Sequence, residues 1–112
     1  MTYKEVATMV NSIGLPYAYY QFPEGTAEAP PFVCFFWSDD NDLKADNLNY
    51  QKIERLNIEL YTDNKDYDNE ANVETVLTNN NVVWSKSETY VDSEHLYMVI
   101  YEADIIVTTE RN

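Results

Sequence analysis

The chain has few of several residue types on which common functions depend. It contains one cysteine, Cys34, which excludes an internal disulfide and a metal site built from several cysteines. It contains two glycines, so it has no glycine-rich loop for binding phosphate. Lysine and arginine number 7 against 20 aspartates and glutamates, and the formal net charge is -13. This charge repels nucleic-acid phosphates and anionic lipid, so we expect no tight nucleic-acid binding.

Long apolar runs are also missing. The longest one, Phe32–Trp37, is far shorter than the ~20 residues that cross a bilayer. The first five residues lead directly into an amphipathic pattern, whereas a signal peptide needs a basic start followed by an apolar stretch. We therefore expect a protein that contacts no membrane, is not secreted and stays in the cytoplasm where it is made.

No residue pattern typical of catalysis or metal binding is present. The single histidine, His95, lies in a polar turn without a nucleophile at a recognisable spacing. Cys34 lies in the most apolar segment, where a thiol is an inert core residue. The acidic runs that start at Asp40 and Asp66 lack the ligand spacing of a calcium loop. The sequence therefore predicts no enzymatic activity, no cofactor and no metal site.

The composition is nevertheless that of a folded protein. Of the 112 residues, 45% are hydrophobic and 14% are aromatic, which is too many for a disordered chain. The length fits one domain over residues 1–112, with residues 108–112 as a frayed tail. Ten aromatic residues are tyrosines, which suit protein surfaces that are both apolar and wet. Our candidates for contact with another subunit are Tyr50, Tyr61, Tyr97 and Tyr101.

Two segments have the apolar spacing of amphipathic helices. In the first, Thr2–Ile13, Thr2 and Glu5 form a capping box at the start. In the second, Asp66–Thr78, Asp66 caps the start and Tyr67 belongs to the apolar stripe.

Five further segments are predicted to be strands: 17–22, 32–38, 50–62, 82–90 and 96–107. We expect the first two to form a hairpin across the proline-rich loop 23–31. The third is long enough to project beyond the sheet and is expected to have a bulge near Glu54–Arg55. The order α-β-β-β-α-β-β predicts an α+β domain, with two helices packed on a largely antiparallel sheet of about five strands.

Several segments together resemble one group of proteins. After the capped helix and the aromatic strands come Ala45-Asp-Asn-Leu-Asn-Tyr-Gln-Lys52, Ile58-Glu-Leu-Tyr-Thr-Asp63, an acidic helix and Tyr97-Met-Val-Ile-Tyr-Glu-Ala103. In size and element order, nearly the whole chain resembles small neck or tail proteins of long-tailed phages and prophages of Gram-positive bacteria. Within that group it is most similar to the tail-terminator, or tail-completion, proteins.

The resemblance implies a structural role. Such proteins form a ring, commonly six-fold, that caps the tail tube and docks to the head. The implied partners are further copies of the chain, the tail tube protein and the head connector proteins. The implied location is the host bacterial cytoplasm during assembly and then the neck of the virion. Acidic residues that could line the ring or dock to a partner are Asp39, Asp40, Asp42 and Asp46.

Two alternatives remain open at this point. The chain could be a head-completion or connector protein of the same neck. It could instead be an acidic binding module that mimics DNA and occupies a basic host protein, since its net charge is -13. The loops 23–31 and 39–49 are candidates for segments that become ordered on assembly, because both are long and lack periodicity.

Overall fold

A computed structural model describes residues 1–23, 25–26, 28–40 and 51–108. It contains two helices and one five-stranded sheet, which confirms the α+β class. In chain order the elements are α1 (Tyr3–Asn11), β1 (Tyr17–Tyr19), β2 (Phe32–Asp40), β3 (Gln51–Thr62), α2 (Tyr67–Asn79), β4 (Ser85–Val91) and β5 (Leu96–Thr108).

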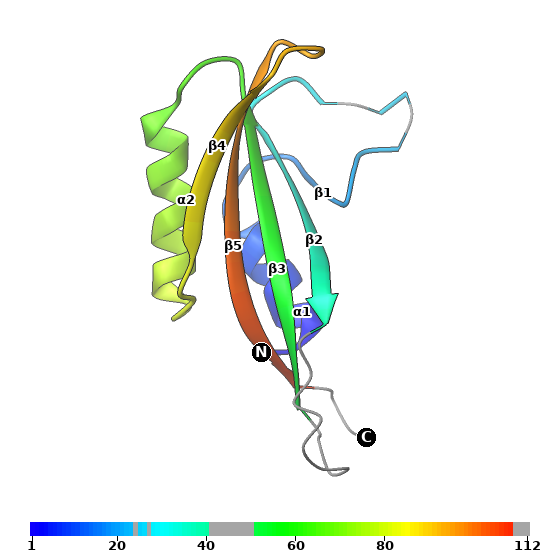
Figure 1. Ribbon diagram of the computed structural model, residues 1–112, viewed down its shortest axis with the longest axis vertical. Helices are drawn as coiled ribbons and strands as arrows, with labels where there is room; N and C mark the ends of the chain where they lie inside the picture. Colours follow the sequence, from blue (N-terminus) through cyan, green and yellow to red (C-terminus); the bar gives the residue numbers. More distant parts are fainter. Residues whose placement is uncertain (24, 27, 41–50, 109–112) are drawn as a thin grey trace.

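The sheet has the strand order β1-β2-β3-β5-β4 (Figure 1). Every neighbouring pair is antiparallel except β1 and β2, which run parallel, with Tyr17 opposite Val33 and Tyr19 opposite Phe35. The predicted hairpin between the first two strands is therefore wrong. A parallel connection needs a dozen or more residues, and the proline-rich segment between β1 and β2 is long enough to return the chain to the start of the sheet.

The two longest strands, β3 and β5, pair along their whole length, from Gln51 opposite Thr108 to Thr62 opposite Tyr97. The prediction that β3 projects beyond the sheet is therefore wrong, and Thr108 belongs to β5 rather than to a frayed tail. The irregularity expected near Glu54–Arg55 occurs at that level of the sheet, but it lies on the neighbouring strand β2, between Ser38 and Asp40.

Both helices cover the same face of the sheet. Figure 1 shows α1 behind the strands and α2 alongside β4. The capping box of α1 is present, and the Asp66 side chain accepts a hydrogen bond from the Asn69 N–H at the start of α2, as predicted. Tyr67, by contrast, is 74% exposed and takes no part in the apolar stripe of α2.

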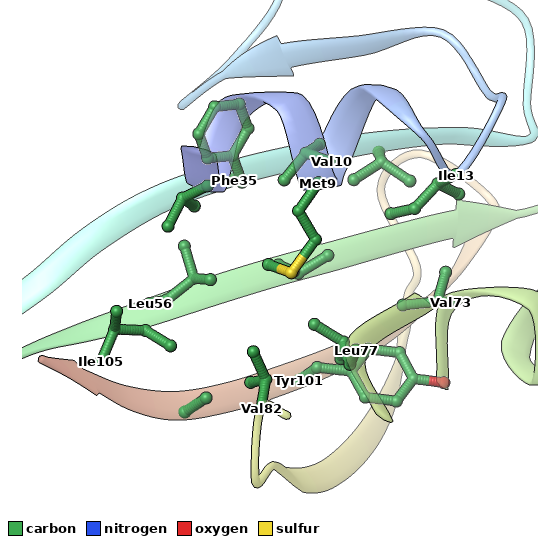
Figure 2. Packing of buried hydrophobic residues seen from close by; sticks show 14 of the residues in the cluster. Met9, Val10, Ile13, Phe35, Leu56, Val73, Leu77, Val82, Tyr101 and Ile105 are labelled. Carbon is green, nitrogen blue, oxygen red and sulfur yellow. The ribbon is translucent and has the colours of Figure 1, made fainter. Parts of the chain in front are cut away.

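The hydrophobic core lies between these helices and the sheet (Figure 2). Alternate residues of β3 point toward the helices, as the sequence pattern predicted. Burying a side chain of this size stabilises the fold by about 1.5–3 kcal/mol. The largest fully buried core side chains are Tyr101, Leu56, Ile58, Leu60 and Leu77.

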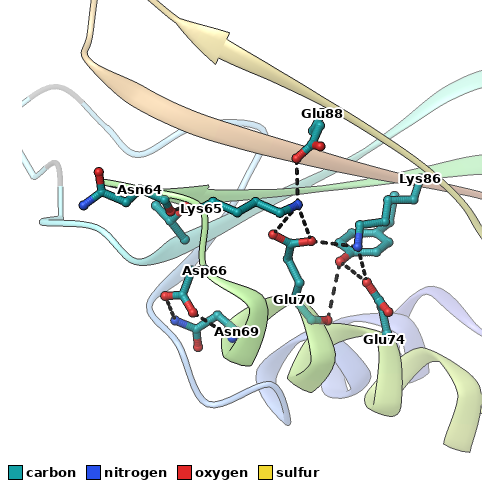
Figure 3. Close-up of polar contacts among 10 residues, drawn as sticks. Asn64, Lys65, Asp66, Asn69, Glu70, Glu74, Lys86 and Glu88 are labelled. Atoms are coloured by element: carbon teal, nitrogen blue, oxygen red, sulfur yellow. Dashed lines mark hydrogen bonds and ion pairs between the residues drawn. The ribbon is translucent and has the colours of Figure 1, made fainter.

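An ion-pair network connects α2 to the edge of the sheet (Figure 3). The Glu70 carboxylate on α2 is 3% exposed; Lys65 Nζ lies 2.9 Å from both of its oxygens and Lys86 Nζ lies 2.7 Å from Oε1. Lys65 also contacts Glu88 on β4, and Lys86 contacts Glu74 on α2, each at 2.7 Å. Glu70 Oε2 receives no well-directed hydrogen bond, so the nearby ammonium charges are what stabilise it.

Candidate functional site

The second face of the sheet is covered by neither α1 nor α2, and we call it the open face. Side chains alternate between the two faces of a strand, so its members are every second residue of each strand. Most of these side chains are half-buried by their neighbours on the strands. The open face consists of Ala18, Phe32, Cys34, Phe36, Ser38, Ile53, Arg55, Asn57, Glu59, Tyr61, Ser85, Ser87, Thr89, Val91, Leu96, Met98, Ile100, Glu102, Asp104 and Ile106.

Aromatic rings are concentrated at one end of the open face. Phe32 stacks on Tyr61 of the neighbouring strand, with ring centroids 4.9 Å apart, and Phe22 packs edge-on against Phe32 at 5.3 Å. Tyr20 packs at a tilt against Phe36 at 5.3 Å. Aromatic residues bury a large apolar area, and tyrosine also keeps its hydroxyl in water. A cluster of such residues therefore suits contact with another protein.

These rings surround a hollow of about 520 Å³, which we call the aromatic hollow. Its volume lies within the range of about 300–1,000 Å³ that is usual for binding pockets. Its lining residues are Tyr20, Gln21, Phe32, Cys34, Phe36, Glu59, Tyr61, Val91, Glu94 and Met98.

One carboxylate, Glu59 of β3, lies within this apolar surrounding. Its neighbours across the sheet are Cys34 on β2 and Ile100 on β5, and its Oε1 accepts a hydrogen bond from the Tyr61 hydroxyl at 2.9 Å. Burial raises the pKa of Glu59, and the hydrogen bond from Tyr61 offsets only part of that effect. In the part of the chain that the structure describes, no cation lies within ion-pair distance of Glu59.

The thiol of Cys34 lies beneath the same hollow and is unreactive. Its residue is 4% exposed. Burial, together with the charge of Glu59, raises the pKa of Cys34 to about 11, so the thiolate is scarce at neutral pH. This agrees with the prediction that Cys34 is a core residue.

Replacing Glu59 by glutamine should stabilise the protein at neutral pH. The pKa of Glu59 is higher in the folded protein than in the unfolded chain. The protonated side chain therefore contributes stability fully below the unfolded pKa, and this contribution is lost as the pH rises through the folded pKa. Glutamine keeps the acceptor for Tyr61 and removes the charge. We expect Glu59→Gln to raise Tm by about 2–4 °C at neutral pH and to match wild type below about pH 4, in thermal scans by circular dichroism.

A matched variant controls for the change in net charge. Glu28→Gln removes one charge from an exposed loop residue and should leave Tm nearly unchanged. If the Tm of Glu59→Gln is at or below that of wild type at neutral pH, the cost of burying the Glu59 charge is already offset by its surroundings, and the prediction is wrong.

The structure separates the four candidate tyrosines. Tyr61 lies on the open face, in the aromatic cluster. Tyr97 is half-buried on the helix side of β5, with Tyr90 edge-on at 6.3 Å. Tyr101 is 1% exposed and belongs to the core, so its selection as a surface contact is wrong. Tyr50 lies outside the described residues.

The four candidate acidic residues lie at the end of β2 or beyond it. Asp39 and Asp40 are the last two residues of that strand. Asp42 and Asp46 lie outside the described residues. His95 lies in the turn between β4 and β5, exposed and with φ of 54°, as the sequence predicted for a turn residue.

Sequence reasoning missed Glu59 and Tyr20 as members of a site. The alternation along β3 does place Glu59 beside Tyr61 on the face opposite Leu60, which was a usable signal. The positions of Cys34 and Ile100 on either side of Glu59 depend on the strand order, which one sequence does not reveal.

No protein-family model and no curated protein matches the chain. Neither of the two described helices is long and apolar enough to cross a membrane. Within the described ranges, no three His, Cys, Asp or Glu side chains lie close enough together to hold a metal ion.

Proposed function

We propose that this protein is a structural component of the head-to-tail neck of a long-tailed phage or prophage, and that it acts as a tail terminator that forms a ring. In this role it caps the tail tube and binds the head connector, and it turns over no substrate. A head-completion protein of the same neck is the nearest alternative. The observation that carries the proposal is the open face, an aromatic sheet surface that the protein's own helices leave uncovered.

An uncovered face of this kind favours an assembly role. Exposed apolar surface that is contiguous rather than scattered is characteristic of sites of protein contact. On the open face, the aromatic cluster continues into Met98 and Ile100 of β5. Glu102 and Asp104 separate this cluster from Ile106, a second apolar position that is 52% exposed and lies opposite Ile53 of β3. Among assembly proteins, the resemblance in size and element order to phage neck and tail proteins favours a neck protein.

The ring contact that we propose uses the β4–β5 side of the open face. β4 is an edge strand that pairs with β5 on one side only, and its residues Ser85–Tyr90 are exposed. An unpaired strand edge can bind a strand of a neighbouring chain. A cyclic ring needs such a patch to meet a different patch on the next subunit. Ile106 of β5 lies beyond the end of β4, because Ser85 pairs with Glu102, and it supplies an exposed apolar contact there.

Native mass spectrometry across a concentration series tests this proposal. We expect a discrete closed oligomer, such as a hexamer, whose population grows with protein concentration and with Mg²⁺, because Mg²⁺ relieves repulsion between chains of charge -13. A strict monomer under all conditions would contradict self-assembly. A monomer that forms a tight, salt-sensitive complex with a basic host protein would favour the DNA mimic instead.

A further inference from the structure

We propose that the aromatic hollow binds an arginine side chain presented by a basic segment of another protein. The inference rests on the proposed function, since it names the chemistry of a partner that docks on the assembled ring. The hollow lies mainly over β2 and β3, with Val91, Glu94 and Met98 of the β4–β5 hairpin at its border, whereas the proposed ring contact uses the free edge of β4 and Ile106.

Two acidic side chains line the hollow, and none of the described residues that line it is a lysine or arginine. The acidic side chains are Glu59 of β3 and Glu94, which lies between β4 and β5. Three of the basic residues in the described part of the chain are engaged elsewhere: Lys65 and Lys86 with Glu70, and Arg55 with Asp104 at 3.2 Å. A cationic group entering the hollow would therefore meet a half-buried carboxylate whose only hydrogen bond from the described residues comes from a neutral tyrosine hydroxyl.

The walls of the hollow select the type of cation. A guanidinium group is planar, stacks on aromatic rings and donates two parallel hydrogen bonds to a carboxylate. Tyr20, Phe32, Phe36 and Tyr61 provide rings around Glu59. Lysine offers a compact charge that is more strongly hydrated and does not stack as a plane, so arginine fits this surrounding better.

Backbone strain at the rim indicates that the arrangement is held in place for binding. Tyr20 has φ of 70°, in the left-handed region that a bulky residue rarely adopts. Its N–H donates to the Phe35 carbonyl at 2.8 Å, which fixes the residue at the end of β1 while 64% of it stays exposed. Strained residues persist where the surrounding structure holds them, and they are frequent at binding and catalytic sites.

Charge indicates a different protein rather than a second copy as the source of the arginine. A second copy also carries a net charge of -13, and in the proposed ring it contacts the free edge of β4 rather than the hollow. A basic segment is attracted over a distance and gains specificity from the paired charges.

The probe for this inference is a capped tripeptide with arginine between two glycines, titrated into the ¹⁵N-labelled protein. The same peptide with citrulline, the neutral analogue of arginine, and with lysine serve as comparisons. We expect amide signals of Glu59, Tyr61 and Met98 to shift with a dissociation constant on the order of millimolar, as is usual for so small a ligand. We expect citrulline to bind at least about tenfold more weakly, and lysine to bind at an intermediate level.

Matched variants connect the binding to the hollow. Glu59→Gln should weaken arginine binding about five- to tenfold, and Glu94→Gln about two- to threefold, because Glu94 is exposed at the rim. Asp68→Asn removes one charge from exposed α2 and should leave the affinity unchanged. Equal binding of arginine and citrulline, or an unaltered affinity in both glutamine variants, would overturn the inference.

The remaining outcomes separate this inference from the proposed function. Arginine binding by a protein that is monomeric in native mass spectrometry would support the hollow and contradict the ring. A closed oligomer that binds citrulline as well as arginine would support the ring and overturn the hollow. If the arginine peptide dissolves the oligomer, the natural occupant is a second copy, and the assignment to another protein is wrong.

Discussion

Replacing Tyr101 by alanine should lower the free energy of unfolding by about 3–5 kcal/mol, as for other large aromatic residues in a core. Tyr101 is 1% exposed and lies on β5, opposite Ile58 of β3 and Lys86 of β4. Its ring packs edge-on against Trp84, with centroids 5.4 Å apart. Since domains of this size are stabilised by about 5–15 kcal/mol in total, much of the stability would be lost.

Urea denaturation followed by circular dichroism measures this change. Tyr101→Phe separates the ring from the hydroxyl, which donates to Glu74 at 2.8 Å, and should cost about 1–2 kcal/mol. Tyr90→Ala, at a residue 46% exposed, should stay within about 0.5 kcal/mol of wild type. An alanine variant of Tyr101 within about 1 kcal/mol of wild type would show that the ring is not a core residue.

Removing both cations around Glu70 should destabilise the protein to a similar extent. In the double variant Lys65→Met/Lys86→Met, the 3% exposed Glu70 carboxylate has neither of the ammonium partners that lie within 3 Å in the wild type. Leaving a buried charge without its partner costs about 3–5 kcal/mol. Adding Glu70→Gln to the double variant should recover much of the loss in urea denaturation, because the uncompensated charge is then gone.

The dependence on pH gives this network a second readout. Hydrogen bonds to Glu88 and Glu70 raise the pKa of Lys65, so its contribution is present below the unfolded pKa and is lost as the pH rises through the folded value. The hydrogen bond from Lys65 lowers the pKa of Glu88, so that contribution is lost as the pH falls. In the Lys65→Met/Lys86→Met variant, both of these pH-dependent contributions should be absent. If the double variant is as stable as wild type at neutral pH, the network contributes nothing.

Local signals in the sequence predicted the elements well. The capping box of Thr2 and Glu5 and the cap at Asp66 fixed where the helices begin, because each satisfies free N–H groups within a few residues. The alternation along β3 placed Leu56 and Leu60 on the helix side. These signals depend only on neighbouring residues, so a single sequence contains them.

Pairings between distant segments were less predictable. The parallel β1–β2 pair was missed because closeness in sequence favours a hairpin, and nothing local shows that the connecting loop crosses back. Tyr101 was taken for a surface residue because β5 is apolar on both faces from Tyr97 to Tyr101, so alternation there does not distinguish core from surface. The aromatic hollow combines residues of four strands, β2, β3, β4 and β5, and it becomes visible only with their order.

Native mass spectrometry of two aspartate variants beside wild type tests most directly whether the open face is the assembly surface. Ile106→Asp places a charge on the exposed β5 contact, and Thr75→Asp places the same charge on the exposed side of α2. We predict a closed oligomer for wild type and Thr75→Asp, and a monomer for Ile106→Asp at the same concentrations. Equal oligomer fractions in the two variants, or a monomeric wild type, would contradict assembly through the open face.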